Sequence, residues 1–287
     1  LEETLDGKNV TFVYDQDIAA QLWQDRSARP VSKLWIVPEE SCGMSVAEKL
    51  AKVREKMAEE GAEQLLISKL DDIMWLYNIR ANDVDCNPVA LSYTYVSKDK
   101  AVLFIQKEAL TDEAEQHFEK SGVCCEDYDS VVTYLKSCKM SGKVWCSSAD
   151  LSYMLYKLVQ SRAELVDKNN PTEVLKAVKN PVELEHIRDC YIKDSAVLTK
   201  FLFWMKENAG KVPMNELSVA AKLDSMRAEL PGFLDLSFPT ISAYKANAAM
   251  AHYSADEENF STIEADGFYL VDSGGQYEGG TTDVTRT

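Results

Sequence analysis

The chain has 287 residues, of which 46% are hydrophobic and 27% charged, a composition typical of a globular protein of about two domains. Its formal net charge of −16, without any Lys/Arg cluster, argues against nucleic-acid binding. No apolar run approaches the roughly 18–20 residues that a membrane span needs, and the N-terminus lacks the regions of a signal peptide. Seven cysteines without disulfide-framework spacing predict reduced thiols in a cytoplasmic protein.

The first 44 residues predict the end of one domain followed by a linker. Residues 1–44 contain only short apolar patches, Val10–Val13 and Leu34–Val37, before a polar stretch that begins at Pro38. Such a segment is not expected to form a free-standing unit. We therefore expect it to be the remnant of a first domain whose start is missing.

An amphipathic helix is predicted to begin after Ser45. Ser45 and Glu48 have the spacing of a capping box, in which each side chain accepts a backbone N–H bond from the other residue. Apolar residues then recur on one helical face. Gly61 predicts the end of the helix, because glycine accepts the left-handed conformation found at many helix ends.

Short strands and helices alternate after this helix. Strands are predicted at 64–68, 93–96, 101–105 and 143–146, and helices at 111–120, 129–137 and 148–160. The polar turn at 97–100 joins two of these strands as a hairpin. This alternation indicates an α/β domain over residues 45–168.

The pattern changes after the polar, Pro-terminated stretch 167–171. Asn180, Pro181 and Glu183 provide a cap, a first-turn proline and a first-turn acid for a long helix. Helices are predicted from there to about 210 and from 215 to 231, and strands at 237–243 and 267–272. Two long helices followed by antiparallel strands indicate an α+β domain over 169–287, cut short at its end.

Two carboxylates near the C-terminus form a candidate metal site. Asp272 ends an apolar strand, a glycine-rich turn follows, and Asp283 lies eleven positions further on (283 − 272). Asp beside Gly is common in turns, so a purely structural role is one interpretation. The flanking Thr and Val residues favour a strand around Asp283, where Asp is disfavoured. A carboxylate in that position needs a cation, an arginine or a metal ion as partner.

His252 is the second candidate. It follows the predicted strand Thr240–Tyr244, in a loop of small residues that would allow close approach to the backbone. A hydrogen-bonded structural histidine is the alternative, whereas a neutral imidazole could bind a metal or hold a substrate carbonyl. His117 and His186 lie on predicted helices and are expected to be structural or at the surface. No cysteine shows a pairing with histidine, so a thiol nucleophile is unsupported.

Taken together, these segments resemble the Xaa-Pro aminopeptidases (aminopeptidase P) of the pita-bread metallopeptidase family. The closing V-D-S-G-G-Q-Y-E-G-G-T-T-D-V-T-R-T resembles their metal-site signature, and the preceding N-A-A-M-A-H-Y resembles their loop with an active-site histidine. Leu70–Arg80 and Asp83–Pro88 resemble a motif of their middle domain, and Asn180–Arg188 resembles the start of their catalytic domain. The resemblance extends from about residue 45 to 287. The chain is similar to the three-domain form of the family.

The resemblance implies a creatinase-like α/β middle domain followed by the first half of an α+β pita-bread catalytic domain. It implies that Asp272 is a ligand of one metal ion and that Asp283 bridges two, usually manganese. A hydroxide held between the ions would attack the peptide bond before a penultimate proline, because the cations lower the pKa of water and polarise the carbonyl. His252 would steady the substrate or the developing oxyanion. Substrates would be peptides that begin with Xaa-Pro, and the family commonly forms homodimers.

The chain also departs from the family pattern. Three further ligands, one His and two Glu, are expected on later strands and do not occur before Thr287. Ala81 replaces a glycine that usually follows the middle-domain arginine. We therefore expect this chain alone to be an inactive fragment that binds the two ions weakly or not at all.

Two other functions fit the resemblance. A prolidase, which cleaves Xaa-Pro dipeptides, has a similar fold, although the middle-domain motif favours the aminopeptidase. A peptidase-like binding module without metals is the second alternative. The presence of both Asp272 and Asp283 argues against that module, since two facing carboxylates repel each other without a cation.

Overall fold

The computed structural model describes residues 2–13, 16 and 18–287. The chain forms two compact units, Leu1–Pro30 and Val31–Thr287. The first unit contains the short helices α1 (Glu2–Leu5) and α2 (Ile18–Leu22). Residues 1, 14, 15 and 17 of the predicted segment 1–44 lie outside the described residues. No helix in the described part of the chain is long and apolar enough to cross a membrane.

A six-stranded mixed sheet forms the centre of the first part of the second unit. In spatial order its strands are β6 (Cys124–Asp127), β5 (Ala101–Ile105), β4 (Ser92–Ser97), β2 (Ala62–Ile67), β7 (Lys143–Cys146) and β8 (Glu164–Asp167). β4 pairs antiparallel with β2 and β5, and the other neighbours are parallel. The predicted hairpin is confirmed, with Ser97 N–H donating to Lys100 O at 2.8 Å across its turn.

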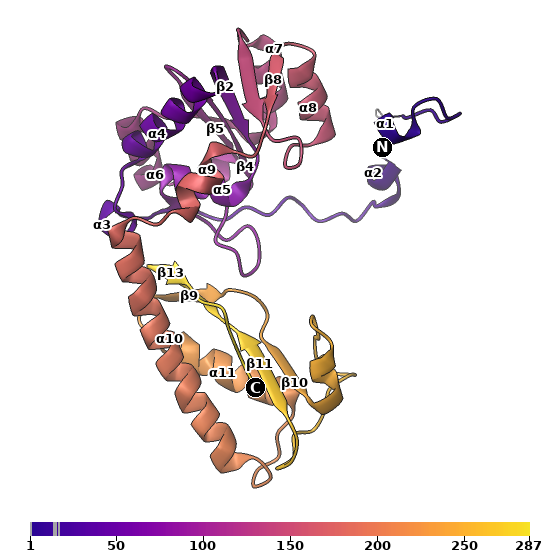
Figure 1. Ribbon diagram of the computed structural model, residues 1–287, viewed down its shortest axis with the longest axis vertical. Coiled ribbons are helices and arrows are strands. Elements are labelled where there is room, and N and C mark those ends of the chain that lie inside the picture. Colours follow the sequence, from indigo (N-terminus) through magenta and orange to yellow (C-terminus); the bar gives the residue numbers. More distant parts are fainter. Residues whose placement is uncertain (1, 14–15, 17) are drawn as a thin grey trace. The chain divides into compact units, whose positions relative to one another are not determined.

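Helices cover both faces of this sheet (Figure 1). One face packs against α4 (Val46–Glu59), α5 (Leu70–Tyr77) and α6 (Asp112–Ser121), and the other against α7 (Val131–Ser137) and α8 (Tyr153–Gln160). Successive side chains of a strand point to opposite faces, so Leu65 and Ile67 join the first core and Leu66 joins the second. Three layers of this kind confirm the predicted α/β class.

Short elements complete this part of the unit. They are β1 (Trp35–Ile36), α3 (Glu39–Cys42), β3 (Ile79–Arg80), α9 (Pro171–Ala177) and the 3₁₀ turns η1 (Lys107–Ala109) and η2 (Tyr128–Ser130). The structure also confirms the limits predicted for α4. Glu48 N–H donates to Ser45 Oγ, Ser45 N–H donates to Glu48 Oε2, and Gly61 has a positive φ of 66°.

The sequence analysis missed the helices α5 and α9 and the strands β6 and β8. β6 and β8 have four residues each and no alternation of apolar and polar positions, so they give no strand signal. The predicted boundary at 167–171 lies between the end of β8 and the start of α9. A buried carboxylate of α5, that of Asp72, binds α9. Asp72 accepts hydrogen bonds from Thr172 Oγ1 at 2.8 Å and from Lys176 Nζ at 2.8 Å.

The second part of the unit contains two long helices and antiparallel strands, which confirms the α+β class. The helices are α10 (Pro181–Asn208) and α11 (Glu216–Ala228). One sheet contains β10 (Ile241–Tyr244), β11 (Tyr269–Ser273) and β14 (Val284–Arg286), and the other contains β13 (Gly280–Thr281), β12 (Gly275–Tyr277) and β9 (Phe233–Leu236). The predicted strand 237–243 is replaced by β9 and β10, on either side of Pro239.

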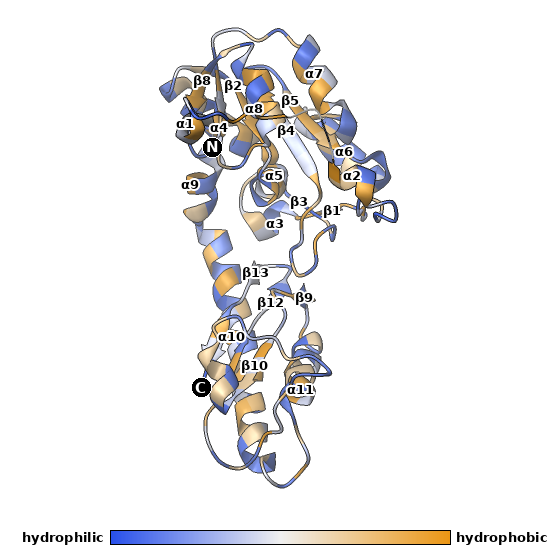
Figure 2. Ribbon diagram, turned by 90° about the vertical axis from the view of Figure 1, so that its right-hand side faces the viewer, coloured by the Kyte–Doolittle hydropathy of each residue, from blue (hydrophilic) through white to orange (hydrophobic). Residues whose placement is uncertain are grey.

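The helix α10 begins as the sequence predicts. Asn180 accepts a bond from Glu183 N–H at 3.0 Å and donates its own N–H to Glu183 Oε2 at 2.9 Å. Figure 2 shows apolar and polar residues alternating along α10. Its buried side packs against α11 and the strands through residues such as Phe201, Leu223 and Val271.

A buried lysine forms hydrogen bonds with the C-terminal end of α5. Lys49 is 1% exposed, and its Nζ donates to Trp75 O at 2.9 Å and to Asn78 Oδ1 at 2.6 Å. The ammonium group lies 4.5 Å from the centre of the Trp75 ring. Burial lowers the pKa of Lys49 from 10.5 to about 8, because the charged form loses its water shell.

This pKa shift predicts a pH dependence of stability. Because the folded chain binds the Lys49 proton more weakly than the unfolded chain, folding improves as the pH rises from about 8 towards 10.5. The unfolding free energy of wild type, minus that of Lys49→Met, should therefore increase over this range in urea titrations. Lys52→Met, at an exposed position of the same helix, provides the baseline. A difference that stays constant with pH would contradict the assignment.

Candidate metal centre

Asp272 lies near the end of β11, in the middle of the sheet β10–β11–β14. The strand β14 runs antiparallel to β11 and places Thr285 directly opposite Asp272. The side chain of Asp272 is half-buried, and its Oδ1 atom is fully buried without a hydrogen-bond partner in the described structure. A buried carboxylate oxygen without a donor is costly, unless a cation or water satisfies it.

Asp283 lies close to this position along the chain, but the prediction that it lies inside a strand is wrong. It is exposed and falls in the break between β13 and β14, immediately before Val284. The break exists because β13 belongs to the other sheet, so the chain must cross before it pairs with β11. The strands β11 and β14 that flank the two carboxylates nevertheless pair antiparallel, and Asp283 lies two residues before Thr285, the partner of Asp272.

Glycine allows the chain to change sheets between the two carboxylates. A Cβ atom at Gly274 would lie 1.9 Å from Thr282 O and 2.4 Å from Ser237 Oγ. Ser237 Oγ donates to Thr282 O at 2.8 Å, and Gly275 N–H donates to Thr282 Oγ1 at 3.0 Å. The glycine at 274 is therefore required by close backbone approach, and Thr282 fixes the residue next to Asp283.

Substituting this glycine should open the crossing. Gly274→Ala forces the backbone near Thr282 to move, and we expect a loss of unfolding free energy of about 3 kcal/mol. Gly61→Ala is the matched control, because it meets no atom within 4 Å and pays only for its positive φ, about 1–2 kcal/mol. Denaturant midpoints of the two variants compare these losses. Equal losses would show that contact with Thr282 is unimportant.

His252 occupies an exposed turn after the 3₁₀ segment η3 (Lys245–Ala249). No hydrogen bond or ion pair joins it to another described residue. The buried carboxylate of Glu216, at the start of α11, instead organises the loop around it. Glu216 accepts bonds from Tyr244 N–H at 2.6 Å, Ser261 N–H at 2.7 Å and Tyr253 Oη at 2.7 Å.

Asn247 completes this hub by donating its Nδ2 to both Glu216 oxygens at 3.1 Å. The partners of Glu216 therefore lie on both sides of His252. Burial, and then the bond to Glu216, raises the pKa of Tyr253 to about 12, so this hydroxyl remains a donor at neutral pH. Glu216 holds the two ends of the His252 loop together.

Removing the charge of Glu216 should loosen this loop. In Glu216→Gln an amide N–H₂ group faces donors, and the loss should be about 2–3 kcal/mol, as for hydrogen bonds to a charged group. Hydrogen exchange should accelerate most in backbone amides between Tyr244 and Ser261. Glu207→Gln, at an exposed site on α10, should leave both quantities unchanged. Uniform acceleration across the whole domain would contradict a local role.

The donor set of the described residues is small. No group of three or more His, Cys, Asp or Glu residues able to hold a metal lies among them. Asp272 and Asp283 are two hard oxygen donors, and the unsatisfied Oδ1 of Asp272 fits a cation. These two residues can thus supply part of a divalent-metal site, and other donors would have to complete it.

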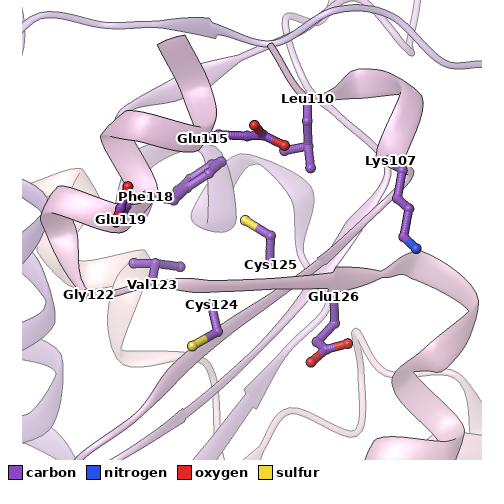
Figure 3. A pocket seen from close by; sticks show the side chains of 10 residues that line it. All are labelled: Lys107, Leu110, Glu115, Phe118, Glu119, Gly122, Val123, Cys124, Cys125 and Glu126. Carbon is purple, nitrogen blue, oxygen red and sulfur yellow. The ribbon is translucent and has the colours of Figure 1, made fainter. Parts of the chain in front are cut away.

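The cysteines form no metal-binding cluster with these carboxylates among the described residues. All seven are free thiols and belong to the described residues. Cys124 and Cys125 lie on β6 beside a cavity of about 610 Å³ that is also lined by Phe118 and Leu110 (Figure 3). The two thiols point to opposite sides of the strand (Figure 3). Burial raises the pKa of Cys125 to about 12, so its thiol is not a ready nucleophile.

Two residues of the region were missed by sequence reasoning. Asp194 and Glu216 are fully buried carboxylates, whereas acids on these helices are normally solvated. Asp194 lies four residues from both Cys190 and Leu198, which are themselves buried, and this spacing was the available signal. The other two histidines have structural bonds, His117 to Tyr77 O at 2.8 Å and His186 to Glu40 O at 3.2 Å.

Comparison with known families agrees with this architecture. Residues 25–183 match the creatinase/prolidase N-terminal domain, so the chain belongs to the family that carries this domain. Residues 185–287 match metallopeptidase family M24. The chain thus combines a creatinase-type N-terminal domain with part of a pita-bread metallopeptidase domain.

The relatives that the chain matches carry the names of Xaa-Pro aminopeptidases. The chain is 38% identical to Xaa-Pro aminopeptidase 1 of Dictyostelium discoideum, over 90% of this chain and 41% of that protein. The crystal structure of an X-prolyl aminopeptidase from Caenorhabditis elegans, described as a cytosolic enzyme with a di-nuclear active site, matches with a TM-score of 0.88 and 29% identity. That match covers 94% of this chain and 45% of the worm protein.

A dipeptidase has the same fold at lower similarity. The Xaa-Pro dipeptidase of Bacillus anthracis matches with a TM-score of 0.65 and 20% identity, over 84% of this chain and 64% of that one. This likeness concerns the fold alone. The chain spans less than half the length of the aminopeptidases that it matches.

Proposed function

We propose that this chain is part of a metallo-aminopeptidase that removes the N-terminal residue from peptides with proline at the second position. The observation that carries the proposal is the Asp272/Asp283 pair within the M24 match, where one buried carboxylate oxygen lacks a protein partner. The similarity to aminopeptidases along 90% or more of the chain supports it.

In this proposal Asp272 and Asp283 are two of the ligands of a pair of divalent metal ions. When bound, these ions would supply a Lewis acid for the substrate carbonyl and lower the pKa of water. Asp272 Oδ1 is a buried oxygen without a protein donor, and the β11–β14 pairing places Asp283 two residues before Thr285, the partner of Asp272. His252 would donate to the substrate from its exposed turn, and Glu216 would hold that turn in place.

Several finer points belong to the same proposal. The metal is manganese, the location is cytoplasmic, and the complete protein forms a homodimer. The domain limits are 1–44 for the remnant of a first domain, 45–168 for the middle domain and 169–287 for the first half of the catalytic domain. Because the described chain supplies two acidic ligands and no third, this chain alone should be inactive.

A prolidase is the second candidate, supported by the common fold. The non-catalytic binding module is less well supported, because the buried oxygen of Asp272 without a protein donor fits a cation. Substrate length separates the two enzymes.

The full-length protein with added Mn²⁺ tests this function. We expect it to release Arg from Arg-Pro-Pro faster than it cleaves Gly-Pro, and Asp283→Ala should reduce kcat by at least about 1000-fold because a metal ligand is lost. Rates are measured by chromatography of the products. Cleavage of Gly-Pro alone would indicate a prolidase.

The control variant is Asp266→Ala, which removes a carboxylate of the same domain that is 91% exposed. It should keep wild-type kcat. Circular dichroism of both variants verifies the fold. Retained activity in Asp283→Ala would refute its role as a ligand.

A further inference from the structure

The β12–β13 hairpin lies in the chain between Asp272 and Asp283, and it is too short to hold its own position. Within it, Gln276 pairs with Thr281 and Tyr277 with Gly280. An isolated hairpin of this length is marginally stable at best in water, and the pairing of β12 with β9 extends it to a sheet of three short strands. Its two ends lead directly to β11 and β14, so its position acts together with the β11–β14 pairing on the relative position of the two carboxylates.

Contacts outside the hairpin must therefore position it. The tip of the hairpin packs closely against α10. A Cβ at Gly279 would be 3.0 Å from His186 Cβ, and a Cβ at Gly280 would be 3.3 Å from Ile187 Cγ1. Such packing limits the approach of the backbone but provides no fixed direction. Besides the backbone pairing of β12 with β9, a directional side-chain contact comes from Tyr277.

The hydroxyl of Tyr277 donates to Asp194 Oδ1 at 2.6 Å. Asp194 is itself held by Arg227, whose Nε donates to Oδ1 at 2.6 Å and whose Nη2 donates to Oδ2 at 3.2 Å. Asp194 and Arg227 are 0% exposed, and Tyr277 is 8% exposed. A two-point contact of this kind fixes the orientation of the carboxylate, so the Tyr277 hydroxyl has one defined position on the two helices.

We propose that Tyr277 is a positioning residue for the metal ligands Asp272 and Asp283. It joins the hairpin to Asp194 on α10 and Arg227 on α11, and this contact sets the separation of the two carboxylates. The inference rests on the proposed metal role of the pair. Tyr277 itself touches neither metal nor substrate.

Metal affinity of the full-length protein tests this role. In Tyr277→Phe the hydroxyl is lost while the ring is retained, and we expect the Kd for Mn²⁺ or Co²⁺, measured by calorimetry, to rise about 10-fold, as for other residues that orient ligands. Tyr244→Phe is the matched control. Tyr244 lies at the end of β10 opposite to Ile241, the partner of Asp272. Its buried hydroxyl donates to Asp266 O, so its loss should change Kd less than about twofold.

A spectroscopic signature separates positioning from general destabilisation. The visible absorption bands of bound Co²⁺ depend on ligand geometry, and they should change in Tyr277→Phe and stay as in wild type in Tyr244→Phe. Melting temperatures should fall by similar amounts in both variants. Wild-type affinity and bands in Tyr277→Phe, or equal changes in both variants, would overturn the proposal.

The outcome for wild type separates this inference from the proposed function. If wild type binds Co²⁺, Asp272→Ala does not and Tyr277→Phe binds like wild type, only the positioning role fails. If wild type and Asp272→Ala bind Co²⁺ equally weakly, the metal role fails and the positioning role fails with it.

Discussion

The second half of the structure depends on the ion pair between Asp194 and Arg227. Both side chains are inaccessible to solvent, so neither charge can be satisfied by water when the other moves. Breaking such a pair by removing one partner typically costs about 3–5 kcal/mol. The pair therefore holds α10 against α11, and the Tyr277 hydroxyl binds strand β12 to the same carboxylate. The helices α10 and α11 and the β12–β13 hairpin are therefore joined at the carboxylate of Asp194.

The creatinase-type N-terminal domain uses its motif residues in a similar structural way. Asp83 accepts bonds from Ser32 N–H at 2.7 Å and from Leu91 N–H at 2.9 Å, which closes the loop between β3 and β4. Asn78 ends α5 in the left-handed conformation, with φ of 53°. The loop closed by Asp83 reaches the hairpin, since Gln276 Nε2 donates to Cys86 O at 3.0 Å. The motif thus supports the shape of a loop that contacts the segment between Asp272 and Asp283.

The carboxylates of the second half fall into two physical classes. Asp194 and Glu216 are fully buried, and protein donors satisfy them, which makes them part of the framework. Asp272 has a buried oxygen for which the described chain provides no donor. The folding free energy lost at such an atom can be recovered by binding a cation. This contrast distinguishes Asp272 from its acidic neighbours more clearly than any feature of the sequence.

Local signals allowed much of this structure to be predicted from sequence. The caps at Ser45 and Asn180, the hairpin turn at 97–100 and the neighbouring strands after Asp272 each depend on residues close together in the chain. Tertiary packing alone decided that Asp283 lies in a break between sheets, that four-residue segments at β6 and β8 become strands, and that Asp194 and Glu216 are buried. An acidic residue on a helix has the same local signature whether it faces water or an arginine, and only the partner brought by the fold distinguishes the two.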